Sequence, residues 1–142
     1  MNIPNKIVVN KLKTIATEGG EVMHALRASE RLIKKFGEVY FSSVEQNVIR
    51  AWKFHNKMTL NLIVPIGMVK FVFYFEESKN FSDYIIGENN YCRLTVPPKT
   101  WFGFQGLNNT KNLIMNIADL EHDPKEMEKK FIDQIKYEWC KK

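Results

Sequence analysis

Short apolar segments separated by turns make up most of the chain, and extended helical patterns are rare in it. The clearest segment is residues 59–66, where the even-numbered positions are all apolar, whereas Thr59 and Asn61 occupy the opposite face. This alternation is typical of a strand with one buried face. Further strand candidates, each rich in β-branched or aromatic residues, are residues 39–44, 48–52, 69–75, 84–86, 91–96, 101–104 and 112–118. A series of short strands without intervening long helices predicts an antiparallel sandwich or barrel, and therefore an all-β protein.

The two ends of the chain depart from this pattern. Residues 1–36 are predicted to be a lead-in segment, with a turn at residues 17–20 followed by a short helix, or by a strand and then a helix. After Asp123, which is expected to cap a helix with Pro124 in its first position, apolar residues follow at helical spacing. These residues are Met127, Phe131, Ile132, Ile135 and Trp139. We therefore predict a single domain, residues 1–142, with a β core at 37–119 and a helical tail at 120–142 that packs on the β body or on a partner.

Composition and charge narrow the classes of partner. The chain has 142 residues, of which 44% are hydrophobic, and this is enough for one domain with a substantial core. Lys and Arg outnumber Asp and Glu by 21 to 16, but the lysines are spread in pairs rather than gathered in one run. With no recognisable nucleic-acid motif, the basic excess predicts no nucleic-acid partner.

The sequence also gives expectations about location. The most apolar stretch, residues 60–75, is interrupted by Pro65, Gly67 and Lys70, so we expect no membrane span and no membrane partner. The first residues lack the apolar core of a signal peptide. Two cysteines do not make a disulfide framework, so a cytoplasmic location is expected.

General catalytic motifs are mostly absent. The three histidines, His24, His55 and His122, are scattered, so the sequence predicts no metal site. It contains no phosphate-binding glycine loop and no nucleophile elbow. We accordingly expect no cofactor.

Several segments taken in order resemble a known family, the short members of the dTDP-4-dehydrorhamnose 3,5-epimerase family. The resemblance covers about residues 18–139 and is carried by the series FGEVYFS, VIRAWKFHNK, MTLN, PPKTWFGF and HDP. It implies a cupin-type jelly-roll barrel, usually a homodimer, that binds a nucleotide-linked sugar, such as a dTDP-sugar, inside the barrel. It also implies a role in nucleotide-sugar and cell-surface polysaccharide biosynthesis.

The resemblance implies a particular reaction, which moves protons next to the ketone of a 4-keto-6-deoxy sugar. This reaction needs a base that reaches the C–H, a group that stabilises the enolate oxygen, and an acid on the opposite face. Arg50 matches the arginine of the family's base segment, Lys53 stands where the family has its catalytic histidine, and His55 matches a second histidine of the short members. Lys53 and His55 are therefore the predicted catalytic residues. A lysine acts as a base only if its pKa falls, and the alternative is that Lys53 forms a salt bridge without any chemistry.

Other residues are predicted to bind the substrate by their place in the motifs. For each residue the alternative is a purely structural role. The aromatic residues would then pack in the core, and the polar residues would lie in a turn or on the surface. This predicted set is Arg50, Lys57, Asn61, Trp101, Phe102 and Asn116.

Besides Lys53, three further departures from the family pattern concern the site. Phe102 replaces a polar residue, Gly19 stands at an arginine position, and Met115 aligns with the general-acid tyrosine of the long members. The main interpretation is therefore an epimerase or isomerase with altered acid and base residues. The alternatives are a non-catalytic family member that binds a nucleotide sugar or a protein partner, and a jelly-roll protein with an unrelated role. A cavity filled by Phe102, Phe104 and Met115 would favour an interaction protein.

Overall fold

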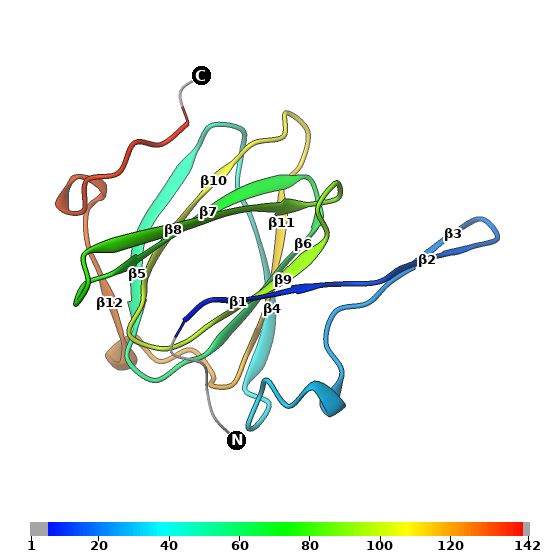
Figure 1. Ribbon diagram of the computed structural model, residues 1–142, viewed down its shortest axis with the longest axis horizontal. Helices are drawn as coiled ribbons and strands as arrows, with labels where there is room; N and C mark the ends of the chain where they lie inside the picture. The colour runs from blue at the N-terminus through cyan, green and yellow to red at the C-terminus, as the bar shows by residue number, and fades with distance from the viewer. Residues whose placement is uncertain (1–5, 141–142) are drawn as a thin grey trace.

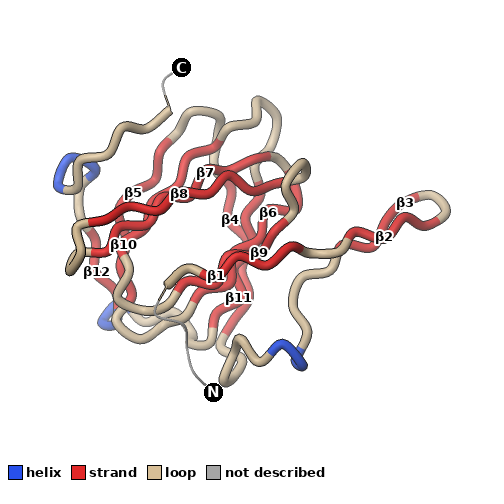
Figure 2. Tube along the Cα trace, viewed as in Figure 1, coloured by secondary structure: helices blue, strands red, loops and turns tan. Residues whose placement is uncertain are grey.

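The computed structural model describes residues 6–140 as two five-stranded antiparallel sheets packed face to face (Figures 1 and 2). The strands of the first sheet, in spatial order, are β1 (Val8–Lys11), β9 (Cys92–Val96), β6 (Leu60–Ile66), β11 (Leu113–Ala118) and β4 (Glu38–Ser43). Those of the second sheet are β12 (Met127–Lys129), β5 (Ile49–His55), β10 (Trp101–Gly106), β7 (Met68–Phe75) and β8 (Asn80–Gly87). The prediction of an all-β antiparallel barrel or sandwich is confirmed.

The core lies between the two sheets because each strand turns alternate side chains inward. In β6, Leu60, Leu62 and Val64 belong to this core, and they are the even-numbered apolar face seen in the sequence. In β7, Phe71 and Phe73 face inward and are fully buried. Burial of these aromatic and aliphatic faces is the main force that holds the sheets together.

An irregularity in β5 changes which of its side chains face inward. β5 pairs with β10, but the register shifts between Phe102 and Gly103, so that Phe102 lies opposite Lys53 while Gly103 lies opposite Ala51. Trp52 is therefore an extra residue in β5, which is the geometry of a β-bulge. As a result Trp52 packs on the outer face of the sheet.

The predicted C-terminal helix is wrong. Asp123 does accept a hydrogen bond from the Lys125 N–H, with Pro124 in the first position, but the helix it begins is the single 3₁₀ turn η2 (Pro124–Glu126). The chain then runs along the free edge of β5 as β12, and a second 3₁₀ turn, η3 (Ile132–Gln134), follows.

Two features of the β body explain why this tail is extended. The edge of β5 offers unpaired backbone groups, and Trp52 exchanges both of its backbone hydrogen bonds with Lys130. The outer face of the same sheet is aromatic, and Ile135, Tyr137 and Trp139 pack on it at a spacing of two residues. Phe131, which the helical spacing required to be buried, is 79% exposed. The tail thus follows the strand period rather than the helical one.

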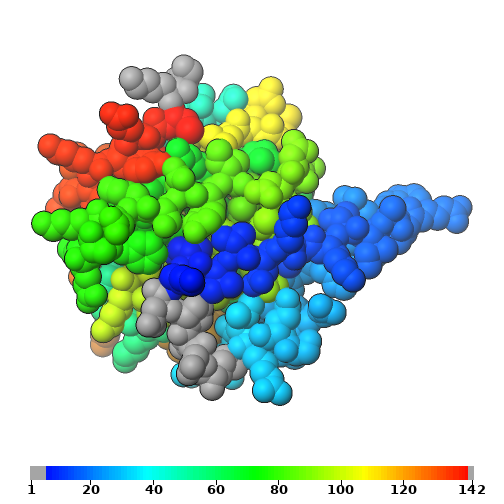
Figure 3. Space-filling model, in the orientation of Figure 1, coloured from blue at the N-terminus to red at the C-terminus, as the bar shows by residue number. Residues whose placement is uncertain are grey.

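The N-terminal segment is also more than a lead-in. β1 pairs with β9 and so completes the first sheet, whereas β2 (Thr14–Thr17) and β3 (Gly20–Met23) form a hairpin that projects from the body (Figures 1 and 3). The predicted turn between residues 17 and 20 is confirmed, and Gly19 takes the positive φ that such a turn requires. The 3₁₀ turn η1 (Ala28–Glu30) follows, and the fully buried Arg93 ties it to β9 through Glu30. Within the described residues, no helix is long and apolar enough to cross a membrane.

Candidate functional site

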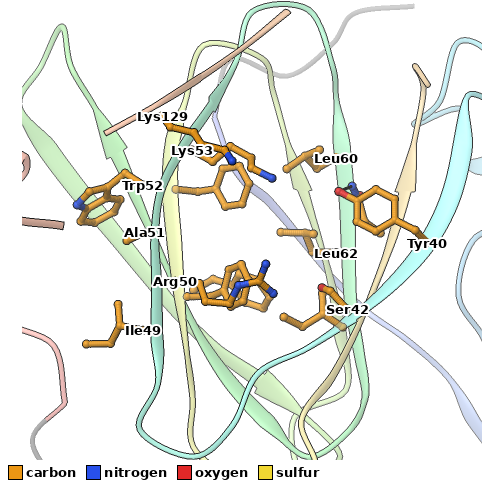
Figure 4. Close-up of a pocket in the computed structure, with 15 residues that line it drawn as sticks. Tyr40, Ser42, Ile49, Arg50, Ala51, Trp52, Lys53, Leu60, Leu62 and Lys129 are labelled. Carbon is orange, nitrogen blue, oxygen red and sulfur yellow. Dashed lines mark hydrogen bonds between the residues drawn. The ribbon is translucent and has the colours of Figure 1, made fainter. Parts of the chain in front are cut away.

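A cavity of about 400 Å³ opens between the two sheets (Figure 4). Leu60, Leu62, Phe71, Phe102 and Phe104 give it apolar walls. Its other lining residues are Tyr40, Ser42, Ile49, Arg50, Ala51, Trp52, Lys53, Ile114, Asn116 and Lys129. The cavity is not filled by Phe102, Phe104 and Met115, which is the arrangement that would have favoured an interaction protein.

Three cations line this cavity, and no acidic residue of the described chain does. Arg50 and Lys53 come from β5, and both face inward only because the bulge at Trp52 shifts the alternation of the strand. Lys129 comes from β12, where it lies directly opposite Lys53 in the register. None of the three forms an ion pair with another residue in the part of the chain that the structure describes. The cavity is therefore suited to a ligand with several negative charges.

Lys53 is half-buried beside the other two cations. Burial lowers the pKa of its amine, and the neighbouring positive charges of Lys129 and Arg50 lower this pKa further. Lowering the pKa of a lysine increases the fraction of neutral amine, which is the form that accepts a proton. The cationic neighbours that lower this pKa are Lys129 and Arg50, and His55 is not among them.

The opposite wall carries a small polar group on the first sheet. Asn116 on β11 donates a hydrogen bond from Nδ2 to Tyr40 Oη at 3.0 Å, while its Oδ1 accepts one from the Asn61 N–H at 3.2 Å. Since Tyr40 accepts a bond here, its own O–H is left to donate into the cavity. Figure 4 shows Tyr40 and Ser42 facing Lys53 and Arg50 across the cavity. The Lys53 amine and the Tyr40 hydroxyl thus lie on opposite walls.

His55 lies behind this cavity rather than in it. The ring is buried, its Nδ1 pairs with the Glu126 carboxylate, and Phe102 stacks on it at a centroid distance of 6.1 Å. Glu126 also accepts hydrogen bonds from the backbone N–H groups of Lys57 and Met58, at 3.0 and 3.2 Å. Burial lowers the pKa of His55 more than the bond to Glu126 raises it. Burial acts to raise the pKa of Glu126, but the hydrogen bonds from His55 and the two backbone groups outweigh it and leave this pKa below its usual value.

Four of the predicted site residues meet in the cavity: Arg50, Lys53, Phe102 and Asn116. The other four do not, and strand alternation explains two of them. Asn61 sits between two leucines that face the cavity, so its own side chain turns to the other side of the sheet and accepts a bond from the Thr95 hydroxyl at 2.7 Å. Trp101 likewise faces outward, where it packs with Trp52 on the outer side of the second sheet. Asn61, predicted to bind the substrate, therefore does not face the cavity, because the sheets bury their apolar faces against each other.

Lys57 and His55 lie near the end of β5, beyond the cavity. Lys57 is exposed in the turn after the strand and borders a separate surface hollow beside Asp119 and Glu126. His55 is held away from the cavity by its pair with Glu126. This partner could not be recognised from the motifs, because 71 positions separate the two residues.

The cavity also contains residues that the sequence did not single out, namely Tyr40, Ser42 and Lys129. Tyr40 was one of several tyrosines with no local feature to select it, and Lys129 was placed on a helix that does not form. Met115, which aligns with the general-acid tyrosine of the long family members, is not among the lining residues; its neighbours Ile114 and Asn116 are. Residues 6–140 contain no group of three or more His, Cys, Asp or Glu side chains arranged to hold a metal ion.

The comparison with known proteins agrees with this geometry. A dTDP-sugar isomerase from Desulfovibrio desulfuricans is 32% identical, with a TM-score of 0.89, and the match covers 95% of this chain and 91% of the other. The chain belongs to the family of dTDP-sugar isomerases and dTDP-4-dehydrorhamnose 3,5-epimerases. The resemblance stated from the sequence motifs is therefore confirmed, and with it the cupin-type jelly roll.

Two further relatives extend the comparison. The spore coat polysaccharide biosynthesis protein SpsL of Bacillus subtilis is 26% identical over 142 residues, or 94% of each chain. A dTDP-4-dehydrorhamnose 3,5-epimerase from Sulfolobus tokodaii shares the fold, with a TM-score of 0.82 at 17% identity over 96% of this chain and 84% of the other. No family model matches the sequence.

Proposed function

We propose that the protein is a nucleotide-sugar epimerase or isomerase that acts on a dTDP-linked 4-keto-6-deoxy sugar in polysaccharide biosynthesis. The observation that carries this proposal is the position of Lys53, which is half-buried at the family's base position and directed into a cationic cavity. The 32% identical relative, named a dTDP-sugar isomerase, supports the substrate class, and the spore coat relative supports the pathway.

In this mechanism the neutral amine of Lys53 takes a proton from the carbon next to the ketone. The electrons of the broken C–H bond form an enolate, whose negative oxygen the cavity's cations stabilise. Arg50 binds the diphosphate, because its guanidinium donates several hydrogen bonds to phosphate oxygens and has no carboxylate partner among the described residues. Phe102 and Asn116 border the sugar. His55, predicted to be catalytic, acts in this scheme from behind Phe102 by holding Glu126.

Epimerisation also needs a donor that returns the proton from the opposite face of the sugar. Tyr40 fits this role because it lies on the wall opposite Lys53 and its O–H is not donated to any described residue. Asn116 fixes the position of its oxygen. A tyrosine on β4 thus replaces the one that is missing from β11.

The test is proton exchange in D₂O with dTDP-4-dehydro-6-deoxyglucose, followed by NMR at the carbons next to the ketone. The wild-type protein is expected to exchange these protons, Lys53→Met to lose the exchange, and Lys57→Met, which lies outside the cavity, to retain it. Exchange that survives in Lys53→Met moves the base elsewhere. Absence of exchange in the wild type, with dTDP bound, overturns the enzymatic proposal in favour of a binding protein.

We infer that the protein forms a homodimer. The hairpin β2–β3 projects from the body and exposes Ile15 and Val22, which are 45% and 50% accessible (Figure 3). On the outer side of edge strand β4, Phe41 is 60% exposed. Apolar surface of this kind on a single copy is typical of an interface. Light scattering on the wild type and on Ile15→Asp tests this inference, and a monomeric wild type refutes it.

The cysteines support a cytoplasmic location for this function. Cys92 is buried and Cys140 is exposed, and neither forms a disulfide. Free thiols are maintained in reducing compartments, so we infer that the protein works in the cytoplasm.

A further inference from the structure

Two lysines face each other across the junction of β5 and β12. Lys129 lies opposite Lys53 in the antiparallel register, and both side chains line the cavity. Figure 4 shows them converging on the same part of it. Like charges in direct cross-strand positions destabilise a sheet, so this arrangement needs an explanation other than stability.

The charged and titratable groups around Lys53 are few. Its own strand contributes Arg50 and, behind Phe102, His55; β12 contributes Lys129; and β4 contributes Tyr40 from the opposite wall. No acidic side chain in the described residues lines the cavity, and the nearby Glu126 is already bound by His55 and two backbone groups. Every fixed charge at the cavity is therefore positive.

Two interacting amines do not lose their protons equally. Lys53 is half-buried, whereas Lys129 is exposed to solvent, so hydration stabilises the charge on Lys129 much better. Burial and the neighbouring charge of Lys129 therefore both lower the pKa of the Lys53 amine.

We propose that Lys129 is a positioning residue whose charge, placed opposite Lys53 in the cavity, makes the Lys53 amine give up its proton more readily and so increases the fraction able to act as a base. This inference rests on the proposed function for its catalytic consequence, but the state of the Lys53 amine is measurable without any turnover. An adjacent cation is a general means of activating a lysine in a protein site.

The tail is built to hold Lys129 in this place. Glu126, immediately before β12, receives hydrogen bonds from His55, Lys57 and Met58, and Trp52 pairs with Lys130 immediately after it. β12 is thus fixed at both ends, so its short length does not leave Lys129 free to turn away. The pair of His55 and Glu126 in this way serves the cavity without entering it.

The neighbouring Lys130 provides a matched control. It carries the same charge one residue later, but its ammonium lies over the outward-facing ring of Trp101, 4.5 Å from the centroid. Lys130→Met and Lys129→Met therefore change the net charge equally, and only Lys129→Met changes the charge inside the cavity.

The experiment is competitive labelling of lysines with acetic anhydride on the full-length protein across a pH series, with the extent of labelling at Lys53 read by mass spectrometry. We expect the labelling of Lys53 at neutral pH to fall several-fold in Lys129→Met, and to stay near the wild-type level in Lys129→Arg and in Lys130→Met. The pH dependence of proton exchange from the dTDP-sugar should shift to higher pH in Lys129→Met alone. Circular dichroism and the labelling of surface lysines verify that each variant is folded, and Lys129→Gln provides a second neutral substitution.

The outcomes separate the two proposals. Unchanged labelling of Lys53 in both Lys129→Met and Lys129→Gln overturns the inference, and so does an equal fall in Lys130→Met, because the effect would then be one of net charge. Altered labelling in a protein whose wild type exchanges no substrate protons supports the role of Lys129 and refutes the proposed enzymatic function. Normal exchange with unaltered labelling leaves the function standing and refutes the role of Lys129.

Discussion

Replacing Glu126 with alanine should destabilise the protein strongly, because this one carboxylate connects β12 to β5. The side chain is 7% exposed; its Oε2 accepts bonds from the N–H groups of Lys57 and Met58, and its Oε1 pairs with His55. In Glu126→Ala these donors lose their acceptor, in a place where little water can replace it. An unsatisfied buried polar group costs about 1–3 kcal/mol, so the expected loss in the free energy of unfolding is about 3–5 kcal/mol.

The assay is urea denaturation followed by tryptophan fluorescence, since Trp52, Trp101 and Trp139 lie in or beside the aromatic cluster that the tail covers. Glu126→Gln serves as the control because it keeps the shape of the side chain and one oxygen acceptor, and it should cost only about 1 kcal/mol. If Glu126→Ala unfolds within about 1 kcal/mol of the wild type, the carboxylate does not hold β12 and the reasoning is refuted.

The same pair predicts how the stability depends on pH. The pKa of Glu126 is lowered in the folded protein, so its contribution is complete above the usual value of 4.5 and is lost as the pH falls through the folded-state pKa. The pKa of His55 is also lowered, so the ring takes up a proton on unfolding and stability decreases as the pH falls below the usual value of 6.5. Both effects have the same sign, and the free energy of unfolding should decrease steadily from neutral to acidic pH. The carboxylate part of this decrease, which lies below the usual value of 4.5, should be absent in Glu126→Ala.

Three other substitutions test separate features of the molecule. Tyr40→Phe should keep proton exchange in D₂O but lose inversion of the sugar, because Lys53 still removes the proton while its return from the opposite wall fails. NMR of the product distinguishes exchange from inversion, and normal inversion would exclude Tyr40 as the donor. Arg50→Met should weaken dTDP binding and flatten its dependence on salt in calorimetric titrations, whereas Lys57→Met should leave both unchanged. Gly67→Ala should destabilise the protein by about 2 kcal/mol or more, because Gly67 has a φ of +88° and a Cβ would collide with the Lys111 carbonyl. Thermal melts of the variant that coincide with those of the wild type would contradict this.

Local patterning predicted most of the β body correctly. The alternation in residues 59–66 became β6 with its apolar face in the core, and the other strand candidates each fall within or overlap an observed strand. This agreement has a physical basis, because a strand buried on one face must alternate whatever its neighbours are. In the tail, local spacing did not decide the structure. Met127, Phe131, Ile135 and Trp139 fit a helical spacing, but Ile135, Tyr137 and Trp139 fit the strand spacing equally well, and only the open edge of β5 decided between them.

The candidate site divides in a similar way. Motif position alone identified Arg50, Lys53, Phe102 and Asn116, all of which line the cavity. It did not identify the residues contributed by strands that are distant in the sequence, because nothing local distinguishes Tyr40 from other tyrosines or Lys129 from its neighbour Lys130.

What the sequence determined by itself is the strands from β4 to β11, the family and the lysine at the family's base position, because these depend on local periodicity and on motifs within short segments. What only the tertiary structure decided is which side chains share the cavity. The bulge at Trp52 turns Arg50 and Lys53 to the same side, and the pairing of β12 with β5 brings Lys129 next to Lys53. Both depend on contacts between segments that are tens of residues apart in the sequence. The pattern within any one segment therefore does not determine them.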